Sequence, residues 1–64
     1  SPMKATPTPF ERAWLLIKGQ PIGIKFTNEE EQFINTALHE AMTSKDAYRK
    51  SEAKELFLEF LNHN

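Results

Sequence analysis

Apolar residues recur along the chain in three groups, each with the spacing of a helix. From Phe10 to Ile17, and again from Phe33 to Met42, they return every three or four residues, the period that gives an α-helix one apolar face. A third group, ending at Leu61, has the same period, but at about 100° per residue its centre is rotated by about 110° from that of the second group. One straight helix could not bury both groups against one neighbour. The pattern therefore predicts three helices, over about residues 9–18, 28–42 and 45–61.

Capping residues predict the ends of the first two helices. Thr8 and Thr27 each stand three residues before a Glu, the pattern of a capping box. Gly19 is expected to end the first helix as the glycine just beyond its last turn, and Pro21 prevents the helix from resuming.

The boundary between the second and third helices carries weaker signals, because residues 27–61 contain no Gly or Pro. We expect Thr43 and Ser44 to supply the capping side chains of the third helix, with Asp46 in its first turn. A single bent helix from residue 28 onward is the alternative.

Residues 20–26 have a different pattern, in which Ile22, Ile24 and Phe26 alternate with Gly and Lys. This is the period of an extended segment. A proline and a glycine in the segment weaken a strand, so we expect an extended linker whose three apolar side chains lie across the helices. The alternative is a strand that pairs with the same segment of a second chain.

The size of the chain indicates one small all-α domain. It has 64 residues and no cysteine, so no disulfide supports its thin core. We expect a tag-cleavage scar and a mobile arm over residues 1–8, with Met3 as the natural start, and a single helical domain over residues 9–64. A chain this short commonly gains stability by association with a second copy or with a larger partner.

The charge balance argues against two classes of partner. Eight basic and nine acidic residues give a net charge of -1, which provides no general attraction to nucleic acid or to anionic lipid. No apolar run approaches the ~20 residues of a membrane span. We therefore expect a soluble cytoplasmic protein that binds neither nucleic acid nor a membrane.

No arrangement of residues indicates catalysis, and we predict that the protein is not an enzyme and has no metal or cofactor. His39 lacks a second His four residues later, so the helical zinc-protease pattern is absent. Both His39 and His63 are expected to be solvated. The acidic residues suit a helix N-terminus and a solvated helix face better than paired acid–base groups. With two glycines, neither a P-loop nor a dinucleotide loop can be written.

The first predicted helix has more apolar residues than a small domain can bury, six in the eight positions 10–17. Such a surplus is typical of an interface. The first half of the third helix is charged, and its basic positions with Tyr48 between them could face an acidic partner, although a solvated helix face is the simpler interpretation. The residues predicted to bind a partner are Trp14, Leu15, Leu16, Lys45, Tyr48 and Arg49.

The segment Pro9-Phe10-Glu11-Arg12-Ala13-Trp14-Leu15-Leu16-Ile17-Lys18 resembles the opening of many small phage-encoded proteins, which often read P-F-x-x-A-W-x-x-L-K. The resemblance implies an accessory factor that binds and blocks a host or defence protein. Our first hypothesis is therefore a non-enzymatic protein-interaction module, which a phage origin would make an inhibitor.

A second resemblance covers residues 22–61, which are similar in outline to ribbon-helix-helix repressors: an alternating segment, a Glu-rich helix start and a second helix containing Lys50-Ser51-Glu52-Ala53. The resemblance implies a dimer whose paired strands turn Gly23 and Lys25 toward DNA. The chain departs from that pattern in lacking the usual Gly between the helices. A dimeric DNA-binding regulator of this type is the alternative hypothesis.

Overall fold

The chain folds into three α-helices, as predicted from its apolar pattern. The structure, a computed structural model, describes residues 7–63, so most of the predicted scar and arm lies outside the described residues. The helices are α1 (Pro9–Gly19), α2 (Asn28–Met42) and α3 (Ala47–Asn62), and no strand occurs among residues 7–63. The small all-α fold is confirmed. None of these helices is long and apolar enough to cross a membrane.

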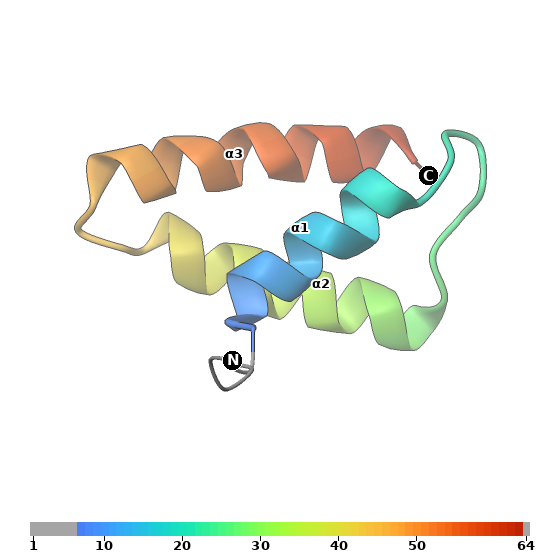
Figure 1. The fold of residues 1–64 in the computed structure, drawn as a ribbon, viewed down its shortest axis with the longest axis horizontal. Coiled ribbons are helices and arrows are strands. Elements are labelled where there is room, and N and C mark those ends of the chain that lie inside the picture. Colours follow the sequence, from blue (N-terminus) through green and yellow to red (C-terminus); the bar gives the residue numbers. More distant parts are fainter. Residues whose placement is uncertain (1–6, 64) are drawn as a thin grey trace, which may run out of the picture.

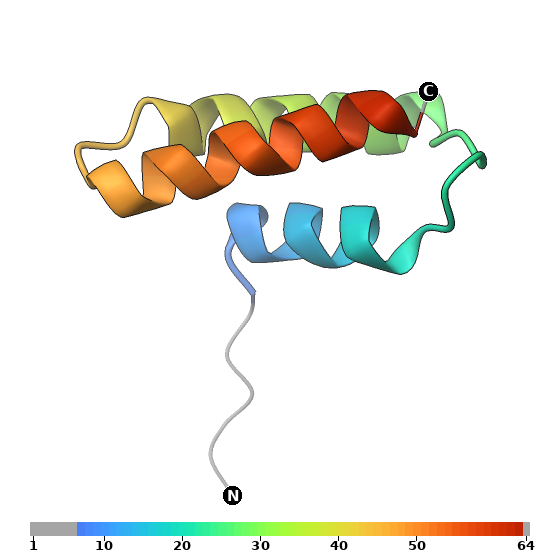
Figure 2. The ribbon, with the colours of Figure 1, turned by 90° about the horizontal axis from the view of Figure 1, so that it is seen from above.

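Helices α2 and α3 run antiparallel and side by side, and α1 lies across one face of this pair (Figures 1 and 2). The buried core lies where the three helices meet, and the linker between α1 and α2 adds one aromatic ring to it. Each helix contributes through the apolar face that its sequence period predicts. The core consists of Ala13, Ile17, Phe26, Ile34, Ala37, Leu38, Leu56 and Phe60.

Both predicted capping boxes are present. The Thr8 hydroxyl accepts from the Glu11 N–H, and the Glu11 carboxylate accepts from the Thr8 N–H, each at 3.1 Å. Thr27 and Glu30 repeat the exchange at the start of α2, at 3.1 and 2.9 Å. These bonds satisfy N–H groups that the first turn of a helix cannot pair internally.

The break between α2 and α3 is real, so the alternative of one bent helix is wrong. The predicted capping residues are also wrong, because the N-cap of α3 is Asp46, and α3 begins at Ala47 rather than at residue 45. The Asp46 carboxylate accepts from the backbone N–H groups of Tyr48 and Arg49, at 3.0 and 3.5 Å. Ser44 instead accepts from the Asp46 N–H at 3.1 Å and shapes the turn.

Replacing this cap should destabilise the protein. Asp46→Ala removes the acceptor of two N–H groups at the start of α3, and we expect the free energy of unfolding to fall by about 1 kcal/mol, as for other N-cap losses. Urea unfolding followed by far-UV circular dichroism measures this change. Asp46→Asn keeps an accepting oxygen, so its free energy of unfolding should fall by only a few tenths of a kcal/mol. An equal loss for both variants would contradict the capping role of Asp46.

The linker between α1 and α2 differs from the prediction. Residues Pro21 to Ile24 form a turn, closed by a 3.3 Å bond from the Ile24 N–H to the Pro21 carbonyl. Phe26 is buried, whereas Ile22 and Ile24 are 79% and 52% exposed. Only one of the three apolar side chains therefore lies against the helices. Gly23 stands at the third position of the turn with φ at +98°, a conformation that an L side chain rarely adopts.

Gly19 does not have the conformation predicted for it. It is the last residue of α1, and Gly23 is the one glycine at positive φ. The helix ends instead because Gln20, which precedes Pro21, is extended, with φ -92° and ψ 127°. Steric contact with the proline ring disfavours the helical conformation at that position.

The two glycines should therefore respond to alanine with opposite signs. At both, an added Cβ meets no atom within 4 Å, so only the backbone differs. Gly23→Ala should cost about 1 kcal/mol for the left-handed conformation, whereas Gly19→Ala should add about 0.4–1 kcal/mol by restricting the unfolded chain. Thermal unfolding of the two variants side by side tests the difference; the same sign for both would contradict the assigned turn.

His63 is buried, which contradicts the prediction that it is solvated. Its side chain is 2% exposed, and its ring lies 5.1 Å from that of Phe26, centroid to centroid. Phe26 also lies 5.5 Å from Phe60, so the imidazole closes the end of the core beside the linker. Neither ring nitrogen has a hydrogen-bond partner in the described part of the chain.

Candidate functional site

The apolar residues predicted to bind a partner divide into two environments on α1. Trp14 and Leu15 are 44% and 59% exposed, whereas Leu16 is half-buried and packs against the core. Two large apolar side chains therefore remain exposed to solvent at adjacent positions of one helix. Their exposure agrees with the surplus inferred from composition.

The second group of residues predicted to bind a partner, two basic residues and a tyrosine, lies at the start of α3 and just before it. Lys45, Tyr48 and Arg49 are all exposed. The Arg49 guanidinium stands over the ring of Phe10, 5.0 Å from its centroid, so the start of α3 lies beside the start of α1. The fold thus places the two predicted groups on neighbouring helices.

One ion pair joins α1 to α3 next to Trp14. The Lys18 Nζ lies 2.6 Å from the Glu59 carboxylate and 5.9 Å from the Trp14 ring centroid. It is the single ion pair among residues 7–63. Because both side chains are over a third exposed, the pair contributes at most about 1 kcal/mol, but it holds an ammonium group at the edge of the exposed indole.

Tyr48 remains a phenol at neutral pH. A hydrogen bond to the Glu52 carboxylate and the negative charge of that group raise the pKa of Tyr48 above its ordinary value, and Asp46 and Glu55 add to the effect. The hydroxyl therefore stays protonated, and it directs its one hydrogen toward Glu52.

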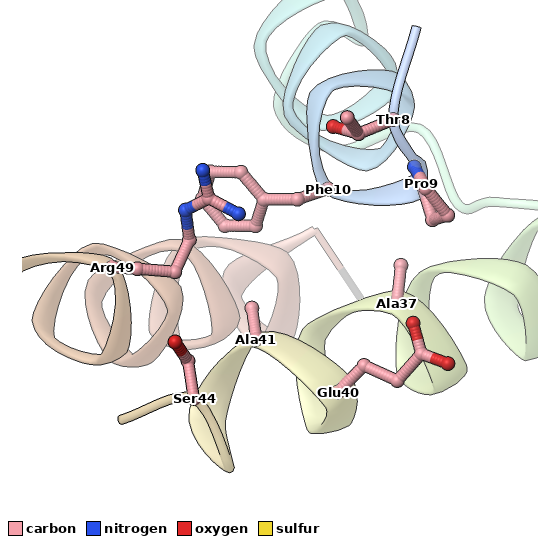
Figure 3. Close-up of a pocket in the computed structure, with 8 residues that line it drawn as sticks. All are labelled: Thr8, Pro9, Phe10, Ala37, Glu40, Ala41, Ser44 and Arg49. Carbon is pink, nitrogen blue, oxygen red and sulfur yellow. The ribbon is translucent and has the colours of Figure 1, made fainter. Parts of the chain in front are cut away.

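A pocket of about 410 Å³ opens where the start of α1 meets the end of α2 and the start of α3 (Figure 3). Its floor is made by Ala37 and Ala41 of α2, both of which are buried. The Phe10 ring stands beside this floor, with the Arg49 guanidinium against it (Figure 3). The lining residues are Thr8, Pro9, Phe10, Ala37, Glu40, Ala41, Ser44 and Arg49. Of these, only Arg49 was predicted to bind a partner.

The two charges on the pocket rim are each placed at the end of a helix that disfavours them. Arg49 lies in the first turn of α3, where the helix dipole favours negative charge, and Glu40 lies in the last turn of α2, where it favours positive charge. Neither forms an ion pair within residues 7–63. The sequence contains both charged residues, but their positions relative to the ends of α2 and α3 are known only from the structure.

The described residues hold no group of three or more His, Asp or Glu side chains that could bind a metal ion. His39 is exposed, as predicted, and its ring lies 6.2 Å from that of Phe57. This surface presents exposed apolar side chains, an aromatic ring with a cation beside it and separate charges.

Exposed apolar residues also occur where none was predicted to bind. Leu58 and Leu61 lie one turn apart on α3, and both are exposed, as are Ile22 and Ile24 in the linker. Sequence reasoning assigned Leu61 to the apolar stripe of the third helix, but Leu61 is exposed, whereas Leu56 and Phe60 of that stripe are buried.

Comparisons of the chain with models of known protein families, with curated proteins and with solved structures find no match.

Proposed function

We propose that this chain is a non-enzymatic protein-interaction module that covers part of another protein with α1 and the start of α3. The observation that carries the proposal is the exposure of Trp14 and Leu15 at adjacent positions of α1. Tryptophan is enriched among the few residues that dominate binding energy at interfaces, because one ring covers a large apolar area and its N–H can still bond.

The surroundings of Trp14 suit such an interface. An apolar centre rimmed by charge is the usual arrangement of a binding surface, and here Lys18 and Glu59 lie beside the indole while Tyr48 and Arg49 lie at the start of α3. The resemblance of the α1 sequence to phage-encoded accessory proteins supports the finer proposal of a cytoplasmic inhibitor that blocks a host or defence protein. The DNA-binding alternative gains no support, because the segment it needs as a strand contains the turn at Gly23.

The test is capture of a partner by the full chain, compared with two single variants that each truncate an exposed apolar side chain. Trp14→Ala removes the proposed anchor, and we expect the affinity for the captured protein to fall at least about tenfold, the effect of a residue that contributes about 1.4 kcal/mol or more. Ile22→Ala removes an exposed apolar side chain from the linker and should leave the affinity unchanged. Thermal unfolding of each variant checks that the fold is kept.

Equal binding by the wild type and Trp14→Ala would refute the proposed surface. A stable single copy by light scattering, with no protein captured from the lysate of its native host, would refute the interaction function itself.

A further inference from the structure

The pocket at the start of α1 has an apolar floor because two small residues stand where larger ones would fill the space. Ala37 and Ala41 lie one turn apart on α2, facing Pro9 and Phe10 of α1. A methyl group cannot reach across to the neighbouring helix, so a concave surface of about 410 Å³ remains. This volume lies at the lower end of the range for ligand sites, which suits one side chain and its flanking backbone rather than a large cofactor.

The charges on its rim give the pocket polarity. Arg49 stands on the Phe10 side, and Glu40 stands across the alanine floor from it (Figure 3). The contact with Phe10, 5.0 Å from guanidinium to ring centroid, offsets the unfavourable position of Arg49 on its helix. Glu40 has no comparable compensation among residues 7–63, because no cation pairs with its side chain there. A charge kept against the local preference of its helix indicates a role outside the fold.

We propose that this pocket binds a short segment of the partner protein in which an aliphatic side chain lies between an acidic and a basic residue. The aliphatic group enters the pocket above Ala37 and Ala41 and lies against the half-buried Phe10, the acidic group pairs with Arg49, and the basic group pairs with Glu40. Guanidinium and carboxylate are complementary in geometry as well as charge, and neither rim charge has an ion-pair partner among residues 7–63. This inference rests on the proposed interaction function and names the chemistry that the pocket recognises.

The test uses short peptides of defined charge pattern and the full chain labelled with ¹⁵N. Four blocked tripeptides are titrated separately: acetyl-Asp-Leu-Lys-amide, acetyl-Asp-Leu-Asp-amide, acetyl-Lys-Leu-Lys-amide and acetyl-Asp-Ser-Lys-amide. Two-dimensional NMR follows the amide signals of Ala37, Ala41 and Ser44. We expect the wild type to bind Asp-Leu-Lys more tightly than either like-charged peptide by about threefold, the effect of one exposed ion pair, and to show no shifts with the serine peptide.

The matched variant is Glu40→Lys, which places a favourable charge at the end of α2 and should not impair folding. We expect its preference to change to Asp-Leu-Asp, while Glu29→Lys, at the other end of α2, should keep the wild-type preference. Equal binding of all charge patterns, an unchanged preference in Glu40→Lys, or shifts confined to residues around Trp14 would overturn the proposal. Its failure is separable from that of the proposed function, because partner capture that depends on Trp14 does not require the pocket.

Discussion

Leu38→Ala is expected to lower the free energy of unfolding by about 2–5 kcal/mol, the range for truncation of a buried leucine. Leu38 has no exposed surface, and it lies one turn after Ile34, which is also fully buried, in the face of α2 that meets both other helices. The cost has two parts, the lost burial of the removed carbons and the cavity left behind. A domain of this size is stabilised by only about 3–5 kcal/mol, so the substitution should remove a large part or all of that stability. Urea unfolding followed by circular dichroism measures the difference.

The matched control is Leu58→Ala, which makes the same chemical change at a side chain that is 63% exposed. It should alter stability by less than about 0.5 kcal/mol, as surface substitutions usually do. If both variants lost the same stability, Leu58 would be buried by a second copy of the chain, and the protein would not be a monomer in solution. Light scattering on the wild type would then show the association directly.

Much of the fold could be predicted because local signals and tertiary packing agree in this chain. The apolar period of α1 and α2 and their capping boxes lie within a few residues of each other in sequence, and each acts through a bond or contact inside one helix. The rotation between the second and third apolar groups correctly indicated a break, since no single helix face could bury both. Helix number, order and approximate extent follow from these signals alone.

The details that could not be predicted are those in which several neighbouring residues could each cap or end a helix. Thr43, Ser44 and Asp46 can all cap a helix, and the structure has Asp46 as the cap of α3, with Ala53 and Leu56 of that helix buried. Gly19 likewise suits a left-handed cap, but the proline two residues later ends the helix through an extended Gln20.

The candidate site could be predicted only in part, because composition shows an apolar surplus but not how the helices pack. A surplus of apolar residues is visible in composition, so the exposure of Trp14 and Leu15 could be anticipated. Which residue turns inward, as Leu16 does, depends on the angle at which α1 crosses the other helices. The pocket is formed by residues 8–10 and by side chains of residues 37–49, which are far apart in sequence, and no local pattern joins Phe10 to Ala41 or Arg49.

His63→Phe is expected to raise the free energy of unfolding by about 1–3 kcal/mol, the cost of a buried polar group left without a partner. Both ring nitrogens of His63 are shielded from solvent and unpaired within residues 7–63. A phenyl ring has a similar shape and can keep the tilted contact with Phe26, 5.1 Å between centroids, while it removes the two polar atoms. The unfolded chain also exposes one more apolar side chain, which favours folding further. Thermal and urea unfolding should both report the gain.

Two further substitutions separate this explanation from a simple packing effect. His63→Ala removes the polar atoms but also the ring, and the lost contact with Phe26 and Phe60 should make it less stable than His63→Phe. His39→Phe makes the same replacement at an exposed histidine of α2 and should change stability by less than about 0.5 kcal/mol. A loss of stability in His63→Phe as large as that in His63→Ala would show that the ring nitrogens are hydrogen-bonded in the folded protein. The end of the core beside the linker would then be a polar contact, and not the apolar closure that the positions of Phe26 and Phe60 describe.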